Sequence, residues 1–411
     1  MKLRDDFLWG ASTSAYQVEG NNWNSDWWEF EHTQGAPVTE PCGDACDHYH
    51  HYTEDIKLLA SLGFNAFRLG IEWSRIEPEM GEISYAAIDH YRRVLQTCRE
   101  QGVEPLVTFL HHTLPRWMAH KGGWLWSESP QRFAAYCDLL SRELSDMISY
   151  AMTINQPDLD TNLGYRWGMT LPGWLALQSM TGDEAAERVE PNLTAAHHKG
   201  REAIRANIPG VKVGMGIASM AWVFDGPEEE LIKQRAVRNW EGNFYAAAEG
   251  DDYIGVQAYT RQWATSSDGD PDAPVGKDGH PYPPGTRMTG MGYEFYPAAI
   301  GEAVRRTVKL TGLPAIVTEN GVAAEDDRER IEYIQGALES LRSCIEDGID
   351  LRGYFHWSLL DNFEWNSGYK MRFGLVHVDR KTFERKPKPS ANFLGDFARR
   401  NEMPFAYIVN R

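Results

Sequence analysis

The chain has 411 residues, of which 42% are hydrophobic and 24% are charged, so it can bury a large core and is unlike a disordered or fibrous protein. Its formal net charge of −18 disfavours binding to nucleic acid or to an anionic membrane surface. The N-terminal segment has no long apolar run, and no stretch approaches the about 20 apolar residues that span a bilayer. We therefore expect a cytoplasmic protein that acts on a neutral small molecule.

Short apolar, β-rich runs alternate with amphipathic helical stretches along the whole chain, which is typical of a parallel sheet covered by helices. Eight such runs occur, at residues 7–12, 65–73, 104–112, 147–155, 211–219, 253–260, 315–320 and 351–360. No repeat, linker or charge run divides the chain. The pattern predicts a single α/β domain, a (β/α)8 TIM barrel over residues 1–411.

The stretches between these runs carry helix signals. Thr53 is expected to cap a helix that stops at Gly63, and Ser129 followed by Pro130 is expected to open another. An apolar stripe at helical spacing over residues 331–345 predicts a third.

Two segments stand outside this alternation. Residues 264–289 are rich in Gly, Pro and Asp and predict one long loop on the face where barrels carry their specificity loops. The second segment holds Cys42, Cys46, His48, His50 and His51, whose spacing matches none of the usual zinc patterns. We therefore expect no metal and no organic cofactor.

Polar residues that are uncommon in buried strands stand at the trailing ends of the eight runs. In a barrel all these ends meet at one mouth, so the sequence predicts a catalytic site there. The residues are Arg68, Glu72, His111, His112, Asn155, Gln156, Gln257, Tyr259, Glu319 and Asn320, with Trp357, Glu364 and Trp365 after the eighth run.

Four segments resemble the motifs of glycoside hydrolase family 1, the β-glucosidase and β-galactosidase family. FLWGASTSAYQVEG (7–20) resembles its N-terminal signature, and VTENG (317–321) resembles its nucleophile motif. Residues 357–379 resemble its C-terminal signature, and TINQP (153–157) resembles its acid/base motif in all but one residue.

The resemblance implies a retaining β-glucosidase in which Glu319 attacks the anomeric carbon and forms a covalent glycosyl-enzyme. Arg68 and Tyr259 match the residues that support this carboxylate. The residues that match sugar contacts are Gln17, His111, Asn155, Glu364 and Trp365, with Trp357 as the platform beneath the ring. Family members that act on 6-phosphorylated sugars replace part of the FEW segment with residues suited to a phosphate. Phe363, Glu364 and Trp365 keep this segment here, so the implied sugar is an unphosphorylated β-glucoside, or a galactoside or fucoside.

Gln156 stands where the family has its general acid/base glutamate. An amide supplies no titratable proton near neutral pH, and losing acid/base assistance costs on the order of 10² to 10⁴ in rate. Plant myrosinases, the thioglucosidases of the family, also carry glutamine here, which is one explanation. The other is an inactivating replacement of glutamate, which we favour because Pro157 follows, as it does in ordinary β-glucosidases. A catalytically silent sugar-binding barrel is a third reading.

Two smaller departures accompany this one. Gln257 and Ala258 precede Tyr259 where the family usually has Asn-Tyr-Tyr, which predicts a change in the breadth of the pocket. His112 stands at a position that is often aromatic, and we expect it to be a satisfied polar group of the core. Asp158 and Asp160 follow Gln156 closely, but both are expected to lie too far along the loop to replace the missing acid.

Overall fold

The computed structural model describes residues 1–170, 172–225, 230, 233, 237–238, 240–265 and 285–404. Eight parallel strands close into a barrel in the order β1-β10-β9-β7-β5-β4-β3-β2. They are β1 (Leu8–Ser12), β2 (Ala66–Gly70), β3 (Glu104–His111), β4 (Tyr150–Asn155), β5 (Lys212–Ala218), β7 (Tyr253–Gln257), β9 (Ala315–Glu319) and β10 (Leu351–Trp357). Each of the eight predicted runs contains one of these strands, so the predicted barrel is confirmed.

Side chains from seven of the strands fill the end of the barrel at which the strands begin. This cluster consists of Leu8, Ala66, Leu106, Met152, Tyr253, Ile316 and Phe355. The packing is tight: a Cβ at Gly10 would lie 2.4 Å from the ring of Phe355, so only glycine fits at that point of β1. Because apolar side chains close this end, the polar residues that follow the strands are left at the other end.

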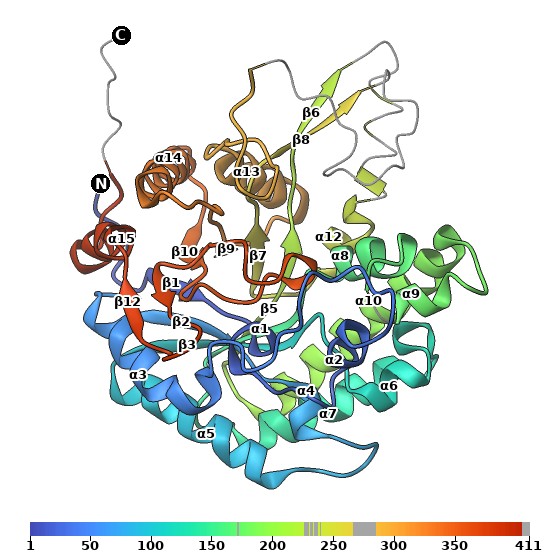
Figure 1. The fold of residues 1–411 in the computed structure, drawn as a ribbon. Helices are drawn as coiled ribbons and strands as arrows, with labels where there is room; N and C mark the ends of the chain where they lie inside the picture. Colours follow the sequence, from blue (N-terminus) through green and yellow to red (C-terminus); the bar gives the residue numbers. More distant parts are fainter. Residues whose placement is uncertain are drawn as a thin grey trace.

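Helices cover the outside of the barrel (Figure 1). The longer ones are α3 (His48–Ser61), α5 (Tyr85–Glu100), α7 (Ser129–Glu143), α10 (Gly182–Asn207), α13 (Ala299–Thr311), α14 (Asp327–Glu346) and α15 (Pro389–Arg400). Their apolar stripes belong to one large buried cluster with the strands, which includes Leu59 of α3, Leu140 of α7 and Leu338 of α14. Hydrophobic burial between helices and strands therefore holds the helices against the barrel.

Short helices fill the loops between strands and longer helices. They are α1 (Ala15–Glu19), α2 (Asp26–Glu31), α4 (Trp73–Ile76), α6 (Arg116–His120), η1 (Gly123–Leu125), α8 (Pro157–Leu159), η2 (Asp160–Arg166), α9 (Gly173–Ala176), α12 (Phe244–Ala247) and η4 (Trp365–Ser367). Of these, α8 and η2, a turn of π-helix, follow directly after Gln156.

Helices are present in all three predicted stretches, but one predicted start is wrong. α7 begins at Ser129 with a proline in its first turn, and α14 contains the whole predicted stripe. The prediction that Thr53 caps a helix is wrong, because α3 already begins at His48 after Asp47. The His48 ring lies 2.7 Å from Asp55 Oδ2, so a contact seven positions along the chain helps keep the first turns helical.

Two small sheets lie outside the barrel. β6 (Ala221–Asp225) pairs in parallel with β8 (Arg261–Thr265), and together they extend away from the barrel in Figure 1. β11 (Val376–Val378) and β12 (Arg385–Pro387) form an antiparallel pair. The predicted loop 264–289 lies mostly outside the described residues, and its first two residues end β8.

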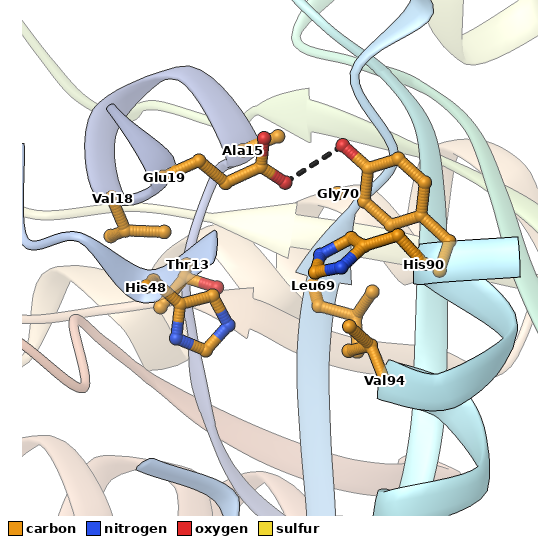
Figure 2. A pocket seen from close by; sticks show the side chains of 10 residues that line it. Thr13, Ala15, Val18, Glu19, His48, Leu69, Gly70, His90 and Val94 are labelled. Carbon is orange, nitrogen blue, oxygen red and sulfur yellow. Dashed lines mark hydrogen bonds between the residues drawn. The ribbon is translucent and has the colours of Figure 1, made fainter. Parts of the chain in front are cut away.

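A small cavity of about 10 Å³ lies between β2 and helices α1, α3 and α5 (Figure 2). Glu19 Oε1 accepts a hydrogen bond of 2.7 Å from the Tyr91 hydroxyl beside it. The space is enough for about one water molecule and too small for a sugar. Among the helices that the structure describes, none is both long and apolar enough to cross a membrane.

Candidate active site

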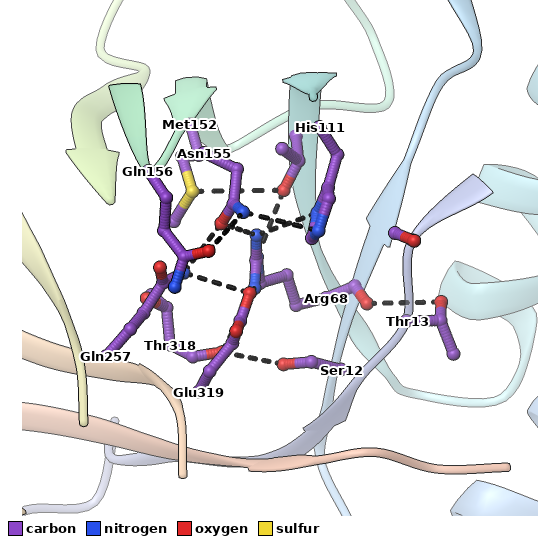
Figure 3. A network of polar contacts seen from close by, with 12 residues as sticks. Ser12, Thr13, Arg68, His111, Met152, Asn155, Gln156, Gln257, Thr318 and Glu319 are labelled. Carbon is purple, nitrogen blue, oxygen red and sulfur yellow. Dashed lines mark hydrogen bonds and ion pairs between the residues drawn. The ribbon is translucent and has the colours of Figure 1, made fainter. Parts of the chain in front are cut away.

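Glu319 is the last residue of β9 and lies buried at the mouth of the barrel, with 3% of its surface exposed. Three donors hold its carboxylate, and two of them, Arg68 and Gln257, are drawn in Figure 3. Arg68 Nη1 lies 2.5 Å from Oε1, Gln257 Nε2 lies 3.0 Å from the same oxygen, and the Tyr259 hydroxyl lies 2.6 Å from Oε2. Both oxygens are thus fixed in position by donors from β2, β7 and the loop that follows β7.

Arg68 connects this carboxylate to the neighbouring strands. Its side chain is fully buried, and its other nitrogens donate to Thr108 Oγ1 at 3.1 Å and to Asn155 Oδ1 at 2.6 Å. A buried cation without a partner would be costly, and here the Glu319 carboxylate offsets its charge. The planar guanidinium therefore fixes Glu319 and Asn155 relative to each other.

Asn155, the last residue of β4, lies at the centre of the network. Its Oδ1 accepts from Arg68 and, at 2.7 Å, from Gln257 Nε2. Its Nδ2 lies 3.2 Å from His111 Nε2. Burial, then the charges of His112 and Arg68, lower the pKa of His111 well below its ordinary value, so this ring is neutral. A neutral imidazole and an amide are suited to hydroxyl groups, which both donate and accept.

Gln156 follows Asn155 in a left-handed backbone conformation, with φ of +47°, and is buried. Its Oε1 lies 3.4 Å from Asn155 Nδ2, and its side chain points into the same network as Glu319 (Figure 3). A non-glycine residue at positive φ is strained, and such residues gather at functional sites. The structure thus brings positions 156 and 319 to one place, as the sequence predicts.

Glu364 and the two tryptophans lie at the same mouth. Burial, then the charge of Glu319, raise the pKa of Glu364 to about 8, although hydrogen bonds to Trp357 and Gln17 oppose the shift. Glu364 Oε2 is buried and has no hydrogen-bond partner among the described residues. Trp357 ends β10, and its ring stacks on that of His111 at 5.7 Å. This carboxyl oxygen is therefore not committed to a contact within the described part of the chain.

Gln17 and Trp365 complete the set that the sequence predicts. Gln17 accepts 2.6 Å from Ser14 and donates 2.7 Å to the carbonyl of Phe363, next to Glu364. The Trp365 ring lies 6.3 Å from the His111 ring and is nearly parallel to it.

Two of the polar residues at the strand ends do not take part. Glu72 accepts from the hydroxyls of Ser74 and Thr113, at 2.8 and 3.0 Å, and so closes the turn that follows β2. Asn320 donates 2.7 Å to the carbonyl of Ala258 and holds two strand ends together. Both contacts are structural.

Sequence reasoning missed two contacts. Gln257 was expected only to alter the breadth of the pocket, yet it donates to both Glu319 and Asn155. Asp160 was expected to lie too far along its loop to replace the missing acid, and its contact with His112, 2.6 Å between Oδ1 and Nδ1, was not predicted. The contact of Gln257 could have been predicted, because Gln257 is a hydrogen-bond donor on the same run as Tyr259. Nothing local in the sequence signals the second.

The segment with clustered cysteines and histidines is held by contacts within the protein. His48 pairs with Asp55 and His50 with Asp47, while Cys42 and Cys46 are buried free thiols. In the part of the chain with described side chains, no three His, Cys, Asp or Glu residues are grouped so that they could hold a metal ion.

A closed parallel barrel with a buried carboxylate, its arginine partner and further polar side chains at the carboxyl ends of the strands is the arrangement of a barrel enzyme. The family model of "Glycosyl hydrolase family 1" matches residues 1–251 and 241–403. The chain belongs to this family and is an O-glycosyl hydrolase.

Individual relatives agree over almost the whole length. Beta-glucosidase A of Thermotoga maritima is 31% identical over 97% of this chain and 98% of its own. A rice protein, "Probable inactive beta-glucosidase 14" from Oryza sativa subsp. japonica, is 32% identical over 95% of this chain and 90% of its own. The crystal structure of beta-glycosidase BGL167 superposes with a TM-score of 0.86, at 41% identity over 98% of this chain and 99% of the other.

Proposed function

We propose that the protein is a retaining β-glycosidase that hydrolyses unphosphorylated β-D-glucosides through a covalent glycosyl-enzyme on Glu319. The observation that carries the proposal is the set of three donors on this carboxylate, from Arg68, Tyr259 and Gln257. They leave it fixed at the mouth of the barrel, where a nucleophile has to be oriented before it attacks.

The proposed sugar contacts come from the polar groups beside Glu319. The unpartnered Oε2 of Glu364 can accept from a sugar hydroxyl, and His111 and Asn155 offer further polar groups. Gln17 positions the segment that carries Glu364. The flat rings of Trp357 and Trp365 suit the apolar face of a pyranose. The relatives named as beta-glucosidases support glucose over other sugars.

The experiment is pre-steady-state hydrolysis of dinitrophenyl β-glucoside, whose leaving group needs no proton. A burst of dinitrophenolate equal to the enzyme concentration, with a fluorinated analogue leaving a covalent label on Glu319, is expected. Glu319→Gln is the control and should show neither burst nor label. A label on another residue, or no burst at all, would contradict the proposal. So would a crystal structure with the carboxyl of Glu319 and the amide of Gln156 much farther apart than the roughly 5.5 Å of retaining pairs.

The two explanations of Gln156 differ in their expected substrates. An inactivating replacement predicts that Gln156→Glu hydrolyses nitrophenyl β-glucoside faster than the parent chain. A natural thioglucosidase, suggested by the glutamine itself, predicts hydrolysis of a thioglucoside with Gln156 in place and acceleration by azide or ascorbate. A third hypothesis is a catalytically silent sugar-binding barrel, since one relative is named as a probable inactive β-glucosidase. It predicts sugar binding without any covalent label.

A further inference from the structure

A histidine and an aspartate form a partly buried pair next to Gln156. His112 Nδ1 lies 2.6 Å from Asp160 Oδ1, and the two side chains are 18% and 12% exposed. His112 follows β3 and Asp160 begins the π-helical turn η2 after β4, so the pair bridges two adjacent strand ends. His112 has φ of +67°, a second strained backbone position at this mouth.

The other ring nitrogen of His112 lies beside Asn155, in the network that holds Gln156 and Glu319. With Nδ1 committed to Asp160, Nε2 lies 3.3 Å from Asn155 Nδ2, the same nitrogen that Gln156 Oε1 approaches to 3.4 Å. Arg68 Nη2 lies 3.4 Å from Nδ1 of the neutral His111 ring, so the hydrogen of that ring is on Nε2 and His111 does not accept from Asn155. A proton added to the His112–Asp160 pair goes to His112 Nε2, the ring nitrogen that Asp160 leaves free.

The charges around His112 favour that proton. Burial alone would lower the pKa of His112, but the charge and hydrogen bond of Asp160, then the charge of Glu319 and a hydrogen bond to Gln156, raise it above its ordinary value. Glu364, from the loop after β10, is a further titratable neighbour, and its pKa of about 8 means that it adds little negative charge near neutral pH. The neutral His111 ring, at 4.9 Å, and the Trp365 ring, at 5.6 Å, pack against it.

We propose that the His112–Asp160 pair performs the acid/base role that Gln156 cannot, with Nε2 of His112 as the group that exchanges the proton. In the first step Glu319 bonds to the anomeric carbon as the bond to the aglycone oxygen breaks, and the Nε2 proton passes to that oxygen. In the second step a water attacks the anomeric carbon, the ester bond to Glu319 breaks, and Nε2 takes a proton from the water. This inference rests on the proposed function.

The electrostatics change in the direction that the two steps need. Before the first step the Glu319 carboxylate favours the proton on His112, which then acts as an acid. Once Glu319 is an ester its charge is gone, so the pKa of His112 falls and the imidazole becomes a better base. Asp160 keeps the ring oriented throughout, as a carboxylate behind an imidazole does in other enzymes.

The test compares substrates with good and poor leaving groups in His112→Asn. For phenyl β-glucoside kcat/KM should fall by about 10²- to 10⁴-fold, because that phenolate needs a proton. The burst with dinitrophenyl β-glucoside should remain, followed by slow turnover that azide accelerates by forming the glycosyl azide. Asp160→Asn should weaken the acid function and shift the alkaline limb of the pH profile to lower pH.

Two further variants separate catalysis from folding. Asp158→Asn is the matched control: Asp158 is a buried aspartate in the same loop, but it accepts from the backbone nitrogen of Ala218 and not from His112, so the ratio of the two substrates should stay unchanged. In the double variant His112→Asn with Gln156→Glu, an ordinary acid should restore hydrolysis of phenyl β-glucoside.

Three results decide the outcome. If His112→Asn hydrolyses phenyl β-glucoside as the parent does, or loses both substrates equally, the inference is wrong. It is equally wrong if the double variant stays as slow as His112→Asn. If the parent itself gives no burst with dinitrophenyl β-glucoside, it is the proposed function that fails.

Discussion

Arg68 and Glu319 form a buried ion pair across the mouth of the barrel, with 2.5 Å between Nη1 and Oε1 and side chains that are 0% and 4% exposed. The two residues are 251 positions apart in the chain; Arg68 lies in the middle of β2 and Glu319 ends β9. Because both charges have left water, each depends on the other, and the pair ties the active centre to the stability of the barrel.

Arg68→Met should therefore destabilise the protein as well as inactivate it. Removing one partner of a buried pair costs about 3–5 kcal/mol, because the other charge stays buried. Urea unfolding of the variant measures this loss. Arg142→Met, which breaks a pair with Asp138 that is 58% and 46% exposed, is the control and should cost no more than about 1 kcal/mol. Equal losses of unfolding free energy in the two variants would show that the buried Arg68–Glu319 pair stabilises the protein no more than an exposed pair does.

Tyr259→Phe should reduce activity with little effect on folding. The change removes only the hydroxyl that donates 2.6 Å to Glu319 Oε2. A hydrogen bond to a charged group contributes about 1.5–3 kcal/mol, which corresponds to a fall in kcat/KM of roughly 10- to 150-fold.

The matched control is Tyr253→Phe, at the start of β7, the strand that precedes Tyr259. Tyr253 donates 2.9 Å to the carbonyl of Ala151 at the closed end, so its loss should lower the free energy of unfolding and leave kcat/KM nearly unchanged. Kinetics with dinitrophenyl β-glucoside and urea unfolding of both variants distinguish the two effects. The assignment of Tyr259 would fail if its variant were fully active.

Glu364→Gln should change how stability depends on pH. The pKa of Glu364 is raised from 4.5 to about 8, so between these values the folded protein keeps a proton that the unfolded chain has lost. The contribution of Glu364 to stability is fully present below pH 4.5 and is lost as pH rises through about 8. Glutamine cannot ionise and removes this loss.

The measurement is urea unfolding of parent and variant at several pH values. Glu72 and Glu31, whose pKa values burial raises to about 7, give the parent a similar slope, so the difference between the two proteins is the quantity to follow. The variant should gain on the parent by on the order of a few kcal/mol between pH 5 and pH 8. Parallel curves for the two proteins would contradict the raised pKa.

Leu338→Ala tests the packing of helices on the barrel. Leu338 of α14 is fully buried, and removing its side chain leaves a cavity that costs about 2–5 kcal/mol. Leu310→Ala on α13 is the control, because Leu310 is 54% exposed and should change stability by less than about 0.5 kcal/mol. Thermal unfolding of both variants checks the difference.

The architecture could be predicted from the sequence because its signals are local. An apolar run reports that a strand is buried on both faces, and an amphipathic stripe reports the side of a helix that faces it. The carboxyl ends of parallel strands must meet at one end of a closed barrel, so Arg68, Asn155, Gln257 and Glu319 could be assigned to one mouth before any contact was known.

Individual contacts at that mouth were decided only by the tertiary structure. Glu72 also stands at the end of a run, but the turn after β2 directs it to Ser74 and Thr113 instead of the centre. The loop after β4 brings Asp160 back to His112, 48 positions away, and positive φ at His112 and Gln156 sets the direction of both side chains. Sequence patterns record which residues are buried, whereas the direction of a side chain in a loop depends on backbone angles that barrel closure imposes. For that reason the residues of the mouth could be predicted, and their partners could not.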